Sequence, residues 1–247
     1  MSDEITTYIL QTTFINVTSQ EGSVLYVTDI KSSPFVVQNI NVINCWSFYG
    51  IISIYDSSNL AFLTSNFTNN TGRIYSCKNC IIALIQNLIL NSNCKFQNEI
   101  EACFLYASDG SSLAINYTAA INVFNSKEGG SIYTIDSTIL LYYFQLNYTG
   151  SDYYGGCMMI VSSNLFLLNS SFNEYSAGCL FVDGSNITLI TNNFTNTKFK
   201  NQQLAYASTI ACVNCEKSTI IGCLFLGNYN NTRLGGVNFK ILNILIF

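Results

Sequence analysis

The sequence predicts an all-β protein that folds as a parallel β-helix, a solenoid of about nine coils. Short alternations of apolar residues, such as Leu60-Ala-Phe62 and Ile52-Ser-Ile54, recur along the chain and indicate strands. A common frame returns every 21 to 33 residues, and self-similarity at such a period is typical of repeat architectures. The chain of 247 residues contains a single Pro, which suits a structure in which nearly every backbone N–H enters a ladder.

Each copy of the frame has an Asn before a short apolar alternation and a large apolar marker residue about eight positions later, as in Asn59 and Phe67. An irregular polar stretch follows, then a pair of small residues such as Gly155-Gly156, and then a second short strand. We expect the marker residues of successive copies to lie in or near one buried column. These markers are Phe14, Val42, Phe67, Leu88, Ile121, Leu146, Phe172, Phe194 and Phe225.

The short strands do not form a pattern of hairpins. No tight Asn-Gly or Asp-Gly turn recurs between strand pairs, and isolated hairpins of such short strands have little stability. Each strand is therefore expected to pair with its equivalent one coil away, about 4.8 Å along the axis.

Asparagine is expected at the corners of the coils, where stacked amides can hydrogen-bond along the axis in partial ladders. The alternative is that Asn is simply a favourable turn residue. One corner would hold Asn59, Asn164 and Asn186, and another would hold Asn16, Asn44, Asn69 and Asn196.

The composition excludes several classes of function. Apolar residues make up 49% of the chain, which is enough to order it. Ten Lys and Arg against 14 Asp and Glu give no positive field for binding nucleic acid. The chain has no His, which excludes Ser-His-Asp and Cys-His catalysis and His-containing zinc sites. We expect no cofactor and no metal.

The two ends of the chain suggest a longer protein. The first residues lack the basic and apolar regions of a signal peptide, no apolar run reaches the roughly 18 residues of a membrane span, and the last residues form an apolar strand. We expect residues 1–247 to be a single β-helix domain, a fragment of a longer repeat protein. Uncovered coils at its ends would favour end-to-end self-association.

A Phe-Asn element followed by a small pair and an apolar residue resembles the repeat of polymorphic outer-membrane proteins. The motif occurs as Phe172-Asn173 with Ala177-Gly178-Cys179-Leu180, and as Phe225-Leu-Gly-Asn228 with Gly235-Gly236-Val237. Such repeats belong to the pectin-lyase-like class of β-helices, and related repeats look common in large surface proteins of protists with AT-rich genomes. The resemblance implies right-handed coiling and a cell-surface or secreted setting, and it implies no single activity.

Two Cys-x-x-Cys pairs, Cys77/Cys80 and Cys212/Cys215, share their register at the corner after the second strand. They lie about five coils apart, roughly 25 Å, which is too far for one tetrahedral zinc site. We interpret each pair as a local disulfide across the corner, with unpaired structural thiols as the alternative. Redox or metal chemistry is less favoured, because no helix N-terminus is predicted to lower a thiol pKa.

A second kind of cysteine pair directly follows the small residues. Cys157 and Cys179 are 22 residues apart, one coil, so their Cα atoms should lie about 5 Å from each other. That separation permits a disulfide, and two reduced thiols stacked in the core fit equally well.

Aspartates recur near one corner of the coils. The favoured interpretation is that they form Asx turns, and the alternative is a carboxylate column that binds Ca²⁺ or acts as an acid/base pair. The equivalent sites at Cys77 and Val161 would break this column. Its members would be Asp29, Asp56, Asp109, Asp136 and Asp183.

The resemblance also provides an enzyme hypothesis. Pectin-lyase-like hydrolases resemble one another in paired Asp residues with a nearby His, Arg and Lys. This chain has no His, and its two arginines, Arg73 and Arg233, lie too far apart in the sequence to share a site. We therefore expect no catalytic residues and no enzymatic activity.

Nine Asn-x-Ser/Thr sequons occur in the sequence. The best candidate acceptors for a glycan are Asn69, Asn147 and Asn230, because they lie in the polar stretch after a marker.

We expect a structural or adhesive protein, extracellular or at the cell surface, that presents loops near residues 91–102 and 198–207 to a protein or carbohydrate. The alternative is a carbohydrate-active enzyme or carbohydrate-binding module. A groove with exposed aromatic residues and two or three carboxylates would favour the alternative.

Overall fold

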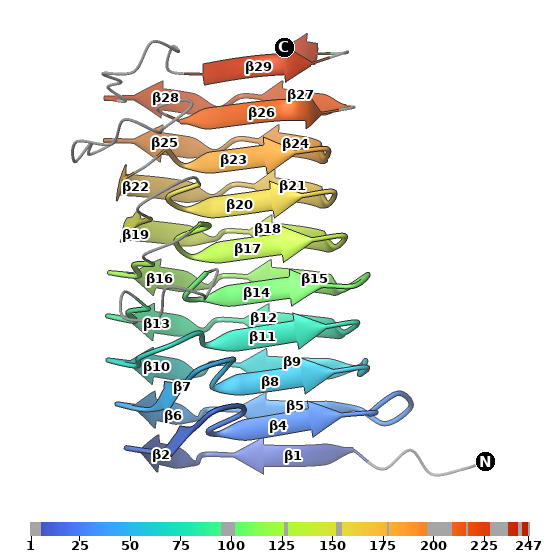
Figure 1. Cartoon of the computed structure of the whole chain (residues 1–247), viewed down its shortest axis with the longest axis vertical. Coiled ribbons are helices and arrows are strands. Elements are labelled where there is room, and N and C mark those ends of the chain that lie inside the picture. The colour runs from blue at the N-terminus through green and yellow to red at the C-terminus, as the bar shows by residue number, and fades with distance from the viewer. Residues whose placement is uncertain are drawn as a thin grey trace.

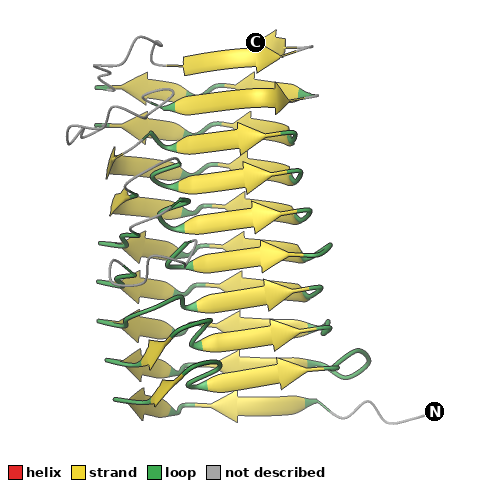
Figure 2. Ribbon diagram, viewed as in Figure 1, coloured by secondary structure: helices red, strands yellow, loops and turns green. Residues whose placement is uncertain are grey.

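The computed structural model describes residues 6–94, 102–125, 128–151, 155–176, 178–196, 209–215 and 217–227, and the strand backbones at 237–241 and 244–246. All elements of this described part are strands, stacked as a solenoid (Figures 1 and 2). The described residues contain no helix that is long and apolar enough to cross a membrane.

The strands form three long parallel sheets and one short pair, β3 (Thr18–Ser19) with β7 (Trp46–Ser47). Sheet 1 has ten strands: β1 (Thr7–Leu10), β5 (Phe35–Gln38), β9 (Leu60–Leu63), β12 (Ile81–Ile85), β15 (Ser112–Asn116), β18 (Thr138–Tyr142), β21 (Asn164–Leu168), β24 (Asn186–Ile190), β27 (Ser218–Ile221) and β30 (Ile244–Ile246). Sheet 2 has nine: β2 (Thr13–Ile15), β6 (Asn41–Ile43), β10 (Asn66–Thr68), β13 (Leu88–Leu90), β16 (Ala119–Ile121), β19 (Gln145–Gly150), β22 (Ser171–Ser176), β25 (Asn193–Thr195) and β28 (Leu224–Leu226). Sheet 3 also has nine: β4 (Leu25–Thr28), β8 (Ile52–Tyr55), β11 (Tyr75–Lys78), β14 (Leu105–Ser108), β17 (Ile132–Ile135), β20 (Met158–Val161), β23 (Leu180–Asp183), β26 (Ile210–Cys215) and β29 (Val237–Ile241).

Each coil passes from sheet 3 to sheet 1 to sheet 2 and then enters sheet 3 of the next coil. In Figure 1 the near strands run to the right and the far strands to the left while the chain climbs, which is a right-handed coil. This is the hand that parallel crossovers prefer. Coils with a strand in all three sheets run from β4–β6 to β26–β28, slightly fewer than the nine expected, with incomplete coils at both ends.

The marker column lies in sheet 2, and the prediction for it is confirmed at most positions. Phe67, Phe172 and Phe194 are buried there, and Phe172 is in register with Phe194. Two of the predicted markers are wrong by one residue. Phe67 is in register with Ile89, not Leu88, and Leu146 is in register with Ala120, not Ile121. Because side chains alternate between the faces of a strand, Leu88 and Ile121 point away from the core.

The corners of the coils share one backbone feature, a residue with positive φ. The corner after sheet 2 has this conformation at Asn16, Asn44, Asn69, Asn91, Asn122, Tyr148, Glu174, Asn196 and Gly227. Asn and Gly adopt the left-handed region at least cost among the residues, which explains much of the Asn content. Amides at this corner also hydrogen-bond along the axis: Asn91 Nδ2 donates to Asn69 Oδ1 at 3.1 Å, and Asn122 Nδ2 donates to Asn91 Oδ1 at 2.9 Å.

The other predicted ladder is interrupted, as expected. Asn186 Nδ2 donates to Asn164 Oδ1 at 3.0 Å. Asn59, however, directly precedes β9, and the equivalent positions between Asn59 and Asn164 are Ile81, Ser112 and Thr138.

Replacing Thr64 by Asn should stabilise the protein by about 1 kcal/mol. Thr64 is a β-branched residue at the corner after sheet 1 with a φ of 46°, whereas the preceding coil has Asn39 at the same corner with a φ of 54°. Both side chains are exposed, so backbone strain dominates the change. Urea unfolding measures it, and the reverse change Asn39→Thr should destabilise by a similar amount. A Thr64→Asn variant less stable than the wild type would contradict this explanation of the corners.

Buried polar side chains line the inside of two corners and connect the coils. After sheet 3, Ser163 Oγ accepts the backbone N–H of Ser137 at 3.1 Å and donates to the carbonyl of Val161 at 2.6 Å. After sheet 1, Asn192 Oδ1 accepts the N–H of Ser170 at 2.9 Å. These side chains satisfy backbone groups that the turn would otherwise leave unpaired in the core.

Candidate functional site

Four of the five predicted aspartates lie at equivalent corners. Asp29, Asp56, Asp109 and Asp136 each directly follow a strand of sheet 3, and their φ values are 60°, 48°, 55° and 48°. All four side chains are exposed. The positive φ explains why Asp recurs there, since Asp tolerates the left-handed region better than most residues.

Asp183 does not belong to this column. It is the last residue of β23, and Gly184 occupies the positive-φ corner that follows. The predicted breaks in the column are also displaced. The corner residues there are Asn79 and Ser162, not Cys77 and Val161, which lie within strands.

The carboxylates contact neighbouring side chains of adjacent coils. Asp56 Oδ1 accepts a hydrogen bond from Asn79 Nδ2 at 2.8 Å, and Asp183 Oδ1 accepts one from Asn214 Nδ2 at 3.1 Å. Asp109 lies 3.4 Å from the ammonium of Lys78, with more than half of each side chain exposed. Among the described residues, no three His, Cys, Asp or Glu side chains gather into a group that could hold a metal ion.

The guanidinium of Arg73 has a structural position. Arg73 is 6% exposed, donates to the backbone carbonyl of Tyr49 at 3.2 Å and lies 4.3 Å from the ring centroid of Tyr106. A cation over an aromatic face is stabilised by the ring quadrupole. Arg233 lies outside the described residues.

Both Cys-x-x-Cys pairs form local disulfides across the corner after sheet 3. The Cα atoms of Cys77 and Cys80 are 5.9 Å apart, as are those of Cys212 and Cys215. All four cysteines are buried. Cys80 is equivalent to Ser111 of the following coil, since the next residues, Ile81 and Ser112, are in register. The backbone N–H of Cys80 donates to Ser111 Oγ.

A third disulfide, Cys94–Cys103, was missed in the sequence. Its Cα atoms are 5.7 Å apart, and the two cysteines are nine positions apart in the sequence. The even cysteine count is the only signal for it, because the polar stretch between the two residues carries no copy of the frame.

The two loops predicted to contact a partner lie mostly outside the described residues. This applies to residues 95–101 of the first loop and to the whole second loop, 198–207.

Cys157 and Cys179 remain free thiols, so the structure has the reduced arrangement and not the disulfide. Both are buried side by side in successive coils. Burial raises the pKa of the Cys179 thiol, and the adjacent Cys157 raises that pKa further. Burial also raises the pKa of Tyr75, whose hydroxyl has no hydrogen-bond partner in the described part of the chain.

The free energy of unfolding should therefore fall as the pH rises above about 8.5, with a further fall near pH 10. The unfolded chain releases the protons of Cys179 and Tyr75 at their ordinary pKa values, while the folded chain keeps both groups neutral. Urea unfolding at about pH 7, 9 and 10.5 measures the loss. Between about pH 7 and 9, a Cys179→Ala variant should lose less stability than the wild type. Identical dependence of stability on pH in the two proteins would contradict the raised pKa of Cys179.

The three candidate glycosylation sites differ in setting. Asn69 is exposed at the corner after sheet 2, and Asn147 is half-buried within β19. Asn230 lies outside the described residues. Use of these sites stays a prediction.

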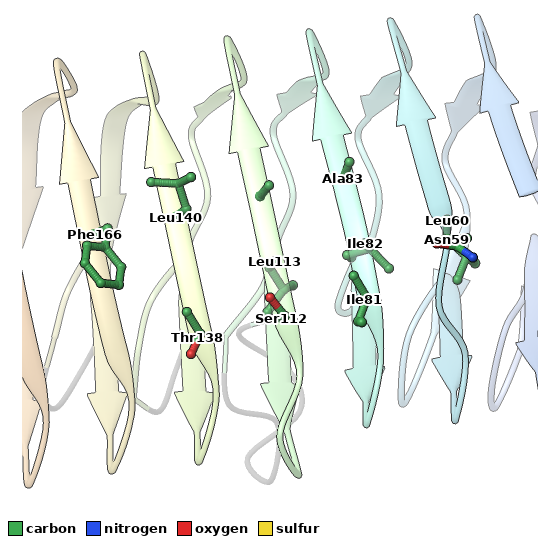
Figure 3. A pocket seen from close by; sticks show the side chains of 11 residues that line it. Asn59, Leu60, Ile81, Ile82, Ala83, Ser112, Leu113, Thr138, Leu140 and Phe166 are labelled. Atoms are coloured by element: carbon green, nitrogen blue, oxygen red, sulfur yellow. The ribbon is translucent and has the colours of Figure 1, made fainter. Parts of the chain in front are cut away.

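A shallow groove of about 570 Å³ follows the outer face of sheet 1 (Figure 3). Eleven residues line it, and none of them ionises. Its walls include an exposed aromatic ring, Phe166, which is 41% exposed. The lining includes the mostly buried Leu60, Ile82 and Leu113, and Ala83, Leu140 and Phe166 from β12, β18 and β21.

No protein-family model matches the sequence, and no curated protein matches it. One solved structure with some likeness is the catalytic domain of a GH87 alpha-1,3-glucanase in complex with nigerose. The likeness is at 12% sequence identity with a TM-score of 0.26, over 89% of this chain and 53% of that chain. The chain thus spans about half the length of that structure.

Proposed function

We propose that this β-helix is a non-enzymatic structural or adhesive scaffold of an extracellular or cell-surface protein, and that it binds partners through its outer faces. The observation that carries the proposal is the position of the aspartate side chains. Four of the five aspartates occupy strained corners, and the side chains of Asp56 and Asp109 there contact Asn79 and Lys78 of adjacent coils.

The disulfides support the proposed location. Three disulfides form among the described residues, and disulfides persist mainly in secreted and surface proteins. A rigid stack with side chains that connect successive coils also suits a scaffold, because solenoids present extended binding surfaces.

The alternative is a carbohydrate-active enzyme or a carbohydrate-binding module. Such a site would combine exposed aromatic rings with carboxylates. The groove on sheet 1 offers the ring of Phe166, but its lining contains no carboxylate. That composition favours the scaffold over glycoside hydrolysis, which needs two carboxyl groups near the scissile bond.

A pair of substitutions at Asp56 separates a corner role from a catalytic one. Asp56→Ala should destabilise the protein by about 1 kcal/mol, because Ala adopts a positive φ less readily. Asp56→Asn should change the stability by less than about 0.5 kcal/mol, because Asn suits the corner and still accepts from Asn79. Urea unfolding and reducing-sugar release are measured for both variants. A sugar-releasing activity in the wild type that both variants lose would overturn the proposal.

A further inference from the structure

The strands of sheet 1 are uncharged, and Lys217, directly before β27, lies at the edge of their outer face. None of the ten strands assigned to this sheet contains Asp, Glu, Lys or Arg, whereas strands of the other sheets contain Lys78, Glu174 and Asp183. Outward side chains of sheet 1 include Ile81 and Phe166, which are 56% and 41% exposed. The outward side chains of these strands form an uncharged face of apolar and neutral polar residues, and an exposed face with apolar side chains of this size can mark an interaction site.

The face has the size of a stable protein interface. Ten strands at the usual spacing extend about 43 Å along the axis, and five residues extend about 17 Å across it. Two such faces in contact would bury about 1,400 Å² in total, within the range of specific protein–protein interfaces.

The middle of this face has a graded shape. The outward residues there form a central column in which three small side chains, Ala61, Ala83 and Ala114, are followed by the large side chains of Leu140 and Phe166. Figure 3 shows Ala83 on β12, Leu140 on β18 and Phe166 on β21, with β15 between the first two. In coil order the central column is Val36, Ala61, Ala83, Ala114, Leu140, Phe166, Thr188 and Thr219.

We propose that sheet 1 is the interface of a twofold-symmetric dimer with a second copy of this chain. The symmetry axis runs parallel to the strands and passes between β15 and β18, so the two solenoids lie antiparallel and face to face. This axis places Phe166 of one copy over Ala83 of the other, and Leu140 over Ala114. Each large side chain then meets a small one, as close packing of two faces requires.

The neighbouring outward column agrees with the same axis. It runs in coil order through Gln38, Leu63, Ile85, Asn116, Tyr142, Leu168, Ile190 and Ile221. The axis pairs Ile85 with Leu168, which is an apolar contact. It pairs Asn116 with Tyr142, so that these two polar side chains meet, and Gln38 facing Ile221 is its one unlike pair. A twofold interface has to be self-complementary in this way.

The third outward column, at the start of the strands, pairs Asn59 with Asn186 and Ser112 with Thr138 about this axis. Ile81 facing Asn164 and, at the ends of the column, Pro34 facing Lys217 are its unlike pairs. The inference stands on the composition and shape of this face and is independent of the proposed function.

The test exchanges the large and the small side chain of a facing pair, Phe166 and Ala83. The chain is produced without glycosylation, because Asn116 on this face is part of a sequon, and its size is measured by sedimentation over a concentration series. The wild type should dimerise. Phe166→Ala and Ala83→Phe should each raise the dimer dissociation constant at least about tenfold, which corresponds to 1.4 kcal/mol. The double variant Ala83→Phe/Phe166→Ala should return toward the wild-type value, because each facing position again has one large and one small residue.

Tyr26→Ala is the matched control, because Tyr26 is an exposed aromatic residue of sheet 3 and its loss should leave the dimer unchanged. Thermal unfolding checks that every variant is folded, and the exchange Ala114→Leu/Leu140→Ala gives a second, independent pair. A monomeric wild type at all concentrations would overturn the proposal, as would a double variant no better than the weaker single. Larger assemblies whose size is unchanged by the substitutions would indicate end-to-end association. A monomer that binds polysaccharide through Phe166 would indicate a sugar site. Either outcome would overturn the proposal.

Discussion

Replacing Phe172 by Ala is expected to destabilise the solenoid by about 3–5 kcal/mol. Phe172 is fully buried in sheet 2, its ring is stacked on Phe194 with centroids 5.0 Å apart, and it contacts Phe144 edge-on at 6.4 Å. The change removes the packing of the ring and leaves a cavity between two coils. Urea unfolding measures the loss.

The matched control is Phe225→Ala in the same column. Phe225 is stacked on Phe194 at 5.1 Å but is 36% exposed, so its loss should cost clearly less than that of Phe172. Equal losses at the two positions would mean that the aromatic column is not the buried core that the stack requires.

Gly156→Ala is expected to cost at least about 3 kcal/mol or to prevent folding. A β-carbon at Gly156 would clash with the backbone carbonyl of Ser176 and lie 2.6 Å from that of Gly178, in the next coil. Since both contacts are with backbone, two coils would have to separate to admit one methyl group.

The control for this change is Gly110→Ala. A β-carbon there meets nothing within 4 Å, so only the positive φ of 78° opposes the substitution, at a cost of about 1 kcal/mol. A Gly156 variant as stable as the Gly110 variant would contradict the close approach of the coils.

The small pairs show how much of the fold could be predicted from the sequence. Their recurrence predicted the repeat, and the structure gives their reason. In Gly129-Gly130 and Gly155-Gly156, the first glycine has a φ of 59° and the second lies against the backbone of the next coil. The positive φ and the close backbone contact fall on adjacent residues, so both select small residues and produce a recurring pair in the sequence.

The errors in register have a local cause. Leu88-Ile89-Leu90 is apolar at every position, so alternation does not distinguish the inward residue. In Ala119-Ala120-Ile121 the small residue at 120 takes the core position and the larger one points out. At the corner, Asp183 precedes a glycine that takes the strained conformation itself. In each case a shift of one residue exchanges the two faces of the strand.

The exposed apolar side chains of sheet 1 could not be predicted for a related reason. Strands of parallel sheets that are covered on both faces are continuous apolar runs, and β21 (Asn164-Leu-Phe-Leu-Leu168) looks like one. Only the course of the coil shows that Phe166 points out of the stack. The third disulfide was beyond prediction because its two cysteines lie in an irregular stretch.

The non-enzymatic role is tested most directly by a sugar-release assay of the purified chain against a panel of plant, fungal and bacterial polysaccharides. We expect no release above a heat-denatured control, because the recurring aspartates lie at corners of the coils and the groove lining contains no carboxylate. Release of reducing sugar that disappears with Asp56→Asn or Asp183→Asn, in variants as stable as the wild type, would contradict it.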